Sequence, residues 1–283
     1  MQNIYNIATS QPEFKKIEVS SVLFSEYKCL EERSVFKAWS HLNFFVYVIQ
    51  GKKKWRTLEN SYMVHANEAL FVKKGANIIH KFFDVQFCAL MIFIPDDFIK
   101  DLIAEKPKIA LGQKRVESDS VIPLKLDKTL STYFSSLYAY FFNEEKPSPH
   151  LMEIKFKELL VNLLSLPINP KIGSYFMDVA QREKPSVEYI MESNFIHNLS
   201  LKEFAELTCR SLSTFKRDFK NRYGTSPGRW LTEKRLQHAE RLLETTDQKI
   251  YEVAFECGFE SPSHFTRVFK KKQGTSPLQY KER

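Results

Sequence analysis

The chain has 283 residues, of which 43% are hydrophobic and 27% charged, with a formal net charge of +8. This length suggests two domains, and no apolar run approaches the ~18 residues of a membrane span. The first residues lack the basic start and apolar core of a signal peptide, and the four cysteines form no CxxC pair. We therefore expect a cytoplasmic protein without membrane contact, disulfide framework or zinc site.

Residues from about 14 to 100 have the composition of a small β-domain. Five short segments are rich in β-branched and aromatic residues and are separated by turn signals: 22–24, 43–50, 54–57, 69–73 and 87–94. Strands at this spacing indicate a small barrel or sandwich. The stretch Asn67-Glu-Ala-Leu-Phe-Val-Lys-Lys-Gly-Ala-Asn-Ile-Ile-His resembles the second half of a cupin repeat. We therefore expect a cupin-like β-barrel.

Catalytic and metal-binding patterns are missing from this region. A metal cupin needs a His-x-His pair, a glutamate and a distant histidine, whereas His41, His65 and His80 stand singly. The chain also lacks an HExxH motif, a glycine-rich phosphate loop and a Ser/His/Asp order. We expect neither a metal, a cofactor nor catalysis.

Aromatic residues of the expected strands allow two interpretations. They could line a ligand pocket inside the barrel, or they could simply fill its core. The candidates are Trp39, Phe45, Tyr47, Trp55 and Phe71.

From residue 124 the apolar spacing changes to three and four, which is typical of helices. Two helices are expected within 124–166, separated by Lys146-Pro-Ser-Pro, and together they form an αα-hairpin. Their apolar faces are wider than one small barrel needs as cover, so we expect a homodimer through these helices. Packing on their own barrel is the alternative. Residues 1–166 would then be a sensing and dimerisation domain, and 167–185, with Pro167 and Pro170, a linker.

Residues 186–283 contain an internal duplication. The stretch from Ser211 to Pro227 repeats from Ser261 to Pro277 at a constant offset of 50, and upstream the offset falls to 49. The second copy is one residue longer in its turn, at Glu260. A period of this size indicates a repeated structural unit.

Each copy has the capping and turn residues expected of two helices joined by a short turn. In the first copy, Ser200 with Glu203 predicts a capping box, and Ser211 predicts the cap of the second helix. In the second copy, Ser261 and Pro262 open the corresponding helix, and Gly258 suits a turn that needs positive φ. Each second helix has one aromatic face and one basic face, and a helix of this kind suits the major groove of DNA. An ordinary amphipathic helix is the alternative for either copy alone, but two in the same register favour DNA.

The stretch from Ala254 to Pro277 reads Ala-x-x-x-Gly-Phe-x-Ser-x-Ser-x-Phe-x-Arg-x-Phe-Lys-x-x-x-Gly-x-Ser-Pro. With the first-copy Phe-Lys-Arg-x-Phe-Lys, it resembles the DNA-binding domain of the AraC/XylS family of bacterial transcription regulators. The resemblance implies an all-α domain whose two helix-turn-helix motifs are joined by a long helix, here about 227–244. Such a helix would span roughly 27 Å, near the ~34 Å between successive major-groove faces. Cys209 departs from the family pattern, which often has Gly or Asn there.

The resemblance also assigns roles to individual residues. The residues expected to contact bases are Ser213, Lys216 and Arg217 in the first copy, and Ser263, His264 and Arg267 in the second. Those expected to contact phosphates are Arg210, Thr214, Lys220, Lys270 and Lys271. The family further implies RNA polymerase as a partner and activation as the mode of regulation.

The sequence therefore predicts a two-domain regulator that binds double-stranded DNA and is controlled through its N-terminal domain by a small-molecule or protein effector. Two alternatives remain open. One is a cupin-type metal enzyme with a DNA-targeting tail, and the other is a regulator whose N-terminal domain binds a protein instead of a small ligand.

Overall fold

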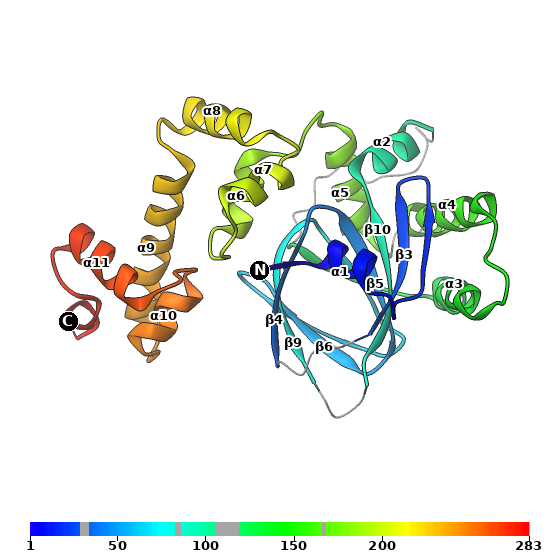
Figure 1. Ribbon diagram of the computed structural model, residues 1–283, viewed down its shortest axis with the longest axis horizontal. Helices are drawn as coiled ribbons and strands as arrows, with labels where there is room; N and C mark the ends of the chain where they lie inside the picture. Colours follow the sequence, from blue (N-terminus) through cyan, green and yellow to red (C-terminus); the bar gives the residue numbers. More distant parts are fainter. Residues whose placement is uncertain (29–33, 83–85, 106–118, 166–167, 283) are drawn as a thin grey trace. The chain divides into compact units, whose positions relative to one another are not determined.

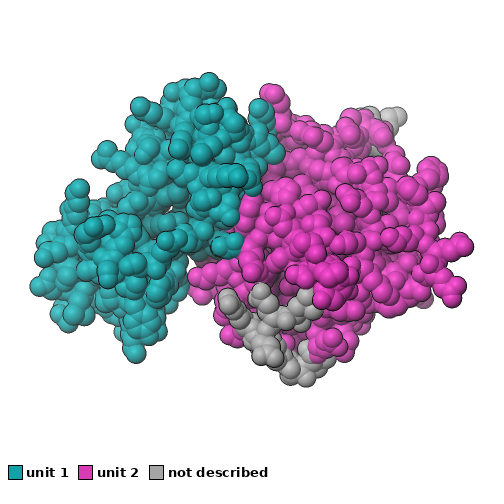
Figure 2. Space-filling view, in the orientation of Figure 1, with its two compact units in different colours: residues 1, 184–283 teal, residues 2–183 magenta. Residues whose placement is uncertain are grey.

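The computed structural model describes residues 1–28, 34–82, 86–105, 119–165 and 168–282. The chain divides into two compact units, coloured separately in Figure 2. We call residues 2–183 the N-terminal unit and residues 184–283 the C-terminal unit, with which Met1 is grouped. No helix in the described part is both long and apolar enough to cross a bilayer.

The strands of the N-terminal unit form two sheets (Figure 1). One sheet has the order β11 (Val121–Leu124), β8 (Ala69–Val72), β5 (Asn43–Gln50), β10 (Cys88–Ile94), β3 (Val22–Lys28) and β2 (Lys16–Val19), with all neighbours antiparallel. The other has the order β1 (Gln2–Asn3), β4 (Val35–Ser40), β9 (Gly75–Lys81), β6 (Lys52–Arg56) and β7 (Ser61–His65). Its neighbours are antiparallel except the parallel pair β1–β4.

Among the described strands these sheets do not close into the single barrel that the sequence predicts. The six-stranded sheet buries both of its faces. Phe44 and Phe45 of β5 point to opposite faces and are each at most 2% exposed. One face packs on the five-stranded sheet and the other on helices, so the unit has two apolar layers. A small barrel needs only its inner face covered.

The layer between the sheets combines residues from both of them with helix α1 (Ile4–Ser10). Its members include Leu23, Val46 and Phe93 from the six-stranded sheet and Trp55 and Ile79 from the five-stranded sheet. Most are β-branched or aromatic residues on alternating strand positions, as expected for stacked sheets.

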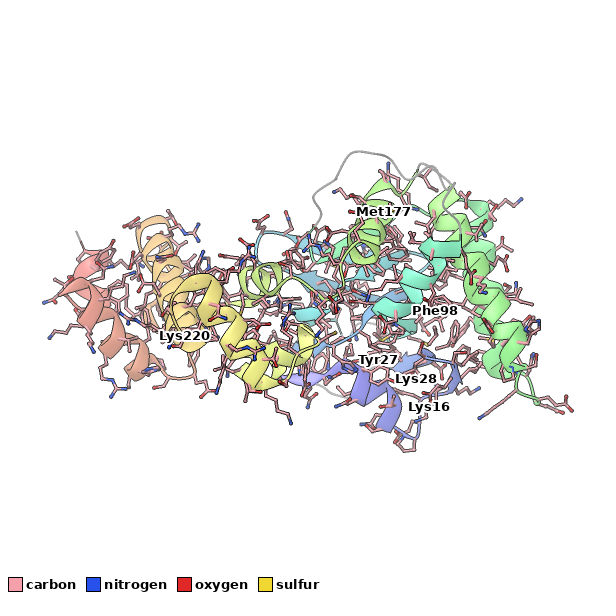
Figure 3. All side chains as sticks on the ribbon, turned by 90° about the horizontal axis from the view of Figure 1, so that it is seen from above. Lys16, Tyr27, Lys28, Phe98, Met177 and Lys220 are labelled. Atoms are coloured by element: carbon pink, nitrogen blue, oxygen red, sulfur yellow. The ribbon has the colours of Figure 1, made fainter. Side chains whose placement is uncertain are left out.

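Helices cover the other face of the six-stranded sheet, on the outer side of β3 and β10 in Figure 1. They are α2 (Asp96–Glu105), α3 (Lys128–Ala139) with the 3-10 turn η1 (Tyr140–Phe142), α4 (Pro149–Ser165) and α5 (Pro170–Ala180). In Figure 3, Phe98 is labelled on α2 and Met177 on α5. The Phe98 ring lies 4.8 Å from that of Phe156 on α4.

Helix α5 occupies the segment that the sequence assigns to a linker. Pro170 stands in its first turn, where proline favours helix formation, although paired prolines suggested a break. Ile172 and Phe176 are fully buried, and the Phe176 ring lies 5.5 Å from that of Phe71 on the sheet. The division at residue 183 therefore follows α5, and this helix belongs to the N-terminal unit.

The five aromatic residues considered for a ligand pocket do not surround one space. Phe45, Tyr47 and Phe71 face the helices, where Tyr47 stacks on Phe134 of α3 at 4.7 Å. Trp55 lies in the layer between the sheets, and Trp39 packs near His41 with ring centroids 6.3 Å apart. Residues 45, 47 and 71 share one face because strand side chains alternate, and they act there as core residues.

The carboxylate of Asp119 joins the hairpin of β6 and β7 to the start of β11. Its Oδ2 accepts hydrogen bonds from Thr57 Oγ1 (2.7 Å), Tyr62 Oη (2.9 Å) and Asn60 Nδ2 (3.0 Å), and its Oδ1 accepts one from the Ser120 amide. Burial alone would raise the pKa of Asp119, but these hydrogen bonds outweigh it and lower the pKa below the ordinary 3.8.

We expect Asp119→Asn to lower the denaturation midpoint of the N-terminal unit at neutral pH. Because the folded-state pKa is depressed, the carboxylate stabilises the fold above pH 3.8, and this contribution is lost as the pH falls below that value. The difference in denaturation midpoint between wild type and variant should therefore disappear in acid. Thermal melts from pH 3 to 7 measure it, with exposed Asp101→Asn as the control. A gap independent of pH would contradict the assignment.

The C-terminal unit is all helical. Its helices are α6 (Val187–Asn194), α7 (Leu201–Leu207), α8 (Leu212–Tyr223), α9 (Pro227–Thr245), α10 (Ile250–Glu256), α11 (Pro262–Gln273) and α12 (Pro277–Lys281). Figure 1 shows α9 running from the α7–α8 end of the unit to the α10–α11 end. The long helix predicted at about 227–244 corresponds to α9, which ends one residue later.

Candidate nucleic-acid interface

The duplicated sequence folds into two helix pairs of equal size. The first helix of each pair, α7 or α10, has 7 residues, and the second, α8 or α11, has 12. Both second helices end at a left-handed glycine, Gly224 or Gly274, whose amide donates to the carbonyl four residues back.

The predicted caps fix where these helices begin. Ser200 and Glu203 form the expected capping box, in which each side chain accepts a hydrogen bond from the other's backbone amide. The hydroxyls of Ser211 and Ser261 accept from the amides of Thr214 and His264, which starts α8 and α11 at equivalent positions.

Buried aromatic residues hold the rear face of each second helix. Phe215 and Phe219 of α8 are fully buried, and the Phe219 ring lies 5.7 Å from that of Trp230 on α9. In α11, Phe265 and Phe269 are equally buried, with ring centroids 5.4 Å apart. Each helix is therefore fixed about its own axis, and its other face is presented to solvent.

The residues expected to read bases all lie on those exposed faces: Ser213, Lys216, Arg217, Ser263, His264 and Arg267. The Arg217 side chain is 70% exposed, and its Nε lies 3.6 Å from the Asp218 carboxylate. An exposed ion pair of this kind contributes little free energy, so the guanidinium can exchange it for another acceptor.

Of the cations expected at phosphates, Lys220, Lys270 and Lys271 are exposed, and Lys220 is labelled on α8 in Figure 3. Thr214 is half-buried, and its Oγ1 accepts from Ser211 Oγ at 2.9 Å. Lysines beside a groove-binding helix suit phosphate contact because each presents a mobile positive charge.

Arg210 has a different position from the one expected. Its Nη1 donates to the carbonyl oxygens of Thr208 (2.7 Å) and Pro185 (3.0 Å), and its Nε to Asp218 (3.3 Å). The guanidinium thus holds the turn before α8 onto the chain that precedes α6. The family resemblance assigns Arg210 to a phosphate, and its carbonyl partners cannot be recognised from the sequence.

Lys272 is a structural cation that the sequence analysis did not single out. Its Nζ lies 2.6 Å from Glu233 and 2.9 Å from Glu240, both on α9. These carboxylates raise its pKa, although burial opposes the change. Glu233 and Glu240 are seven residues apart on one helix face, and this spacing is the signal that could have revealed the contact.

Cys209 has a left-handed backbone conformation in the turn where the family pattern often has Gly or Asn. Its φ is +52°, whereas Gly258 at the equivalent turn has φ +83°. A side chain in this region is strained relative to glycine by roughly 1–2 kcal/mol.

We expect Cys209→Gly to stabilise the C-terminal unit by about 0.5–1 kcal/mol, because the relief of strain exceeds the entropy that glycine adds to the unfolded chain. Cys209 is exposed, so the change removes no core packing. Slower amide hydrogen exchange in α7 and α8 would report the gain. Cys209→Ala keeps the strain and serves as the control, so equal stability of the two variants would contradict the explanation.

No group of three or more His, Cys, Asp or Glu that could hold a metal ion occurs in the described ranges. Reading DNA needs none, since donors on a rigid helix suffice.

Two helices joined by a short turn, the second with a buried aromatic face and an exposed basic face, are the arrangement of a helix-turn-helix DNA-binding unit. Residues 204–283 match the family model described as "Helix-turn-helix domain", and residues 43–175 match "ExsA N-terminal regulatory domain". The chain belongs to the AraC/XylS family of transcription regulators.

Two regulators of other bacteria match it along most of their length. The virulence regulon transcriptional activator VirF of Yersinia enterocolitica is 26% identical over 87% of this chain and 91% of its own. The HTH-type transcriptional regulator ExsA of Pseudomonas aeruginosa is 25% identical over 82% of this chain and 84% of its own. A crystal structure of ToxT from Vibrio cholerae covers 93% of this chain and 97% of its own, at 16% identity and a TM-score of 0.44.

Proposed function

We infer that this protein is a sequence-specific DNA-binding regulator that activates transcription and is controlled through its N-terminal unit. One observation carries the proposal: α8 and α11 each present polar and basic side chains on an exposed face whose rear is anchored by buried phenylalanines. The relatives support activation, since VirF is named a transcriptional activator.

Both helix pairs act as helix-turn-helix motifs in this proposal. Arg217 and Arg267 are the best readers, because a guanidinium can donate two hydrogen bonds to the O6 and N7 atoms of guanine. Lys216, Ser213, Ser263 and His264 read neighbouring bases. Lys220, Lys270, Lys271 and Thr214 contact phosphates, and these contacts fix the register of the protein on the duplex.

The N-terminal unit acts as the switch. The match of residues 43–175 to a regulatory domain supports this role. An effector, either a small molecule or a protein, can change DNA binding only if it has different affinities for the two states of the regulator. The function contains no catalytic step, and we place it in the cytoplasm, where DNA and RNA polymerase are available as partners.

We propose a homodimer through the helices of the N-terminal unit. Phe142, which follows α3, is 58% exposed, and Ile154 on α4 is 50% exposed, although both are large and apolar. Contact between copies would remove this surface from water. Sedimentation velocity of the full-length chain over a range of concentrations tests it, and a monomer at every concentration would rule it out.

Selection of bound duplexes from a random pool by the full-length protein tests the main proposal. We expect two short sequence blocks whose centres lie about one helical turn apart. Selection without any enriched sequence, both for the full chain and with residues 1–183 removed, would contradict sequence-specific binding.

A further inference from the structure

The two helix pairs are connected by more than helix α9. The turn between α6 and α7 also lies against the turn between α10 and α11, within the same compact unit. A Cβ built on Gly258 would lie 2.4 Å from the carbonyl oxygen of Ile196, closer than any side chain can approach. The two turns therefore meet backbone to backbone, and only glycine fits at the contact.

Arg235, in the middle of α9, lies at this contact. Its Nε donates to the carbonyl oxygen of Phe195 (2.7 Å), and its Nη2 donates to that of His197 (2.8 Å). The Nε would also be 3.1 Å from a Cβ on Gly258. Burial lowers the pKa of this guanidinium, and the planar fork satisfies two backbone acceptors at once.

A side-chain bridge completes the contact at the surface. Asn198 Nδ2 donates to Glu260 Oε1 at 2.6 Å. Glu260 is the residue by which the second copy of the duplication is longer than the first. The copies thus differ where they touch, and the additional residue supplies the acceptor.

We propose that Arg235, Asn198, Gly258 and Glu260, which we call the clasp, fix the distance and angle between α8 and α11. They thereby set the spacing of the two DNA blocks that the protein accepts. This inference rests on the proposed function, in which both helices read bases. Arg235 is then a positioning residue, which affects recognition without touching DNA.

The physical reason is that a single helix is a poor spacer. If the two helix pairs were connected only through α9, the second pair could turn about the axis of α9 as that helix bends and twists. The protein would then accept several spacings between the two DNA blocks. A second connection away from that axis blocks this rotation. Once the first helix pair is bound, the second pair then has a higher effective concentration at a DNA block of the correct spacing. At a wrong spacing, binding requires distortion of the protein or of the DNA, which costs free energy.

Arg235→Lys tests the clasp because a single ammonium cannot reproduce the fork that reaches both carbonyls. The full-length variant is titrated with duplexes that carry both selected blocks at the native spacing, with one base pair added or removed, and with either block alone. The matched control is Arg241→Lys, since Arg241 is on the same helix with an exposed side chain.

We expect Arg235→Lys to weaken binding at the native spacing by about tenfold, while binding to single blocks stays within about twofold and the penalty for altered spacing shrinks. Arg241→Lys should change none of these ratios. An unchanged spacing penalty for Arg235→Lys, or an equal loss on single blocks, would overturn the clasp. Wild type that binds only one block would instead contradict the part of the proposed function in which both helix pairs read bases.

A milder pair of variants keeps the test valid if Arg235→Lys folds poorly. Asn198→Asp places a second carboxylate beside Glu260, and adding Glu260→Gln restores a donor and removes the repulsion. The spacing penalty should fall in the single variant and return in the double variant. Equal penalties in wild type, single and double variants would exclude the surface bridge from the clasp.

Discussion

Gly258→Ala is expected to destabilise the C-terminal unit by about 2–5 kcal/mol, the sum of a left-handed backbone penalty and a steric one. The φ of Gly258 is +83°, and the new Cβ would face the Ile196 carbonyl at 2.4 Å. Backbone cannot yield as a flexible side chain can, so the turn before α7 would have to move away from Arg235.

Gly274→Ala separates the two penalties. Gly274 has a similar φ of +76°, but nothing lies within 4 Å of its Cβ position. Its substitution should therefore cost only the backbone term, about 1–2 kcal/mol. Amide hydrogen exchange in α10 and α11 of the full-length variants measures both changes. Equal losses at the two positions would show that the contact with Ile196 is not tight.

The second large effect is expected on sequence recognition. Arg217→Ala and Arg267→Ala should each weaken binding to the selected DNA by about 1–3 kcal/mol, which is about 5- to 150-fold. Each should also relax the preference at a different base pair, because the two arginines lie on different helices. Repeating the duplex selection with each variant reads out both effects.

Lys220→Ala is the control for these variants. An exposed lysine that contacts a phosphate should affect all sequences alike and reduce the salt dependence of binding by about one unit of slope. Relaxation at the same base pair in both arginine variants would contradict the reading of DNA by two separate helices.

The C-terminal unit could be predicted in detail because its signals are local. Helices α7, α8 and α11 begin directly after the predicted caps Ser200, Ser211 and Ser261, since such caps act within one helical turn. What the sequence did not reveal is non-local. Pro185, whose carbonyl binds Arg210, and Phe195 and His197, whose carbonyls bind Arg235, lie 25 to 40 residues away in the chain, so nothing in the local pattern indicates them.

In the N-terminal unit, too, local features could be predicted and non-local contacts could not. The predicted segment 43–50 coincides with β5, and 87–94 begins one residue before β10. Such continuous apolar runs indicate that both faces are buried, but not what covers each face. The aromatic residues at 45, 47 and 71 therefore allow a pocket in the sequence, whereas the structure packs helices over them. Proline-rich spacing likewise concealed α5, whose stability comes from its buried face.

The turn of the first helix pair contains an exposed thiol, that of Cys209, which can report chemically on this part of the protein. Among the cysteines that the structure describes, Cys209 is exposed, whereas Cys88 and Cys257 are buried. Burial raises the pKa of both buried thiols, that of Cys257 to about 12, so they present little thiolate to an alkylating reagent. Alkylation of the native chain should therefore modify Cys209 ahead of those two. Cys209 lies just before α8, so protection of this thiol by a bound duplex would follow occupancy of the first helix pair alone, without any added label.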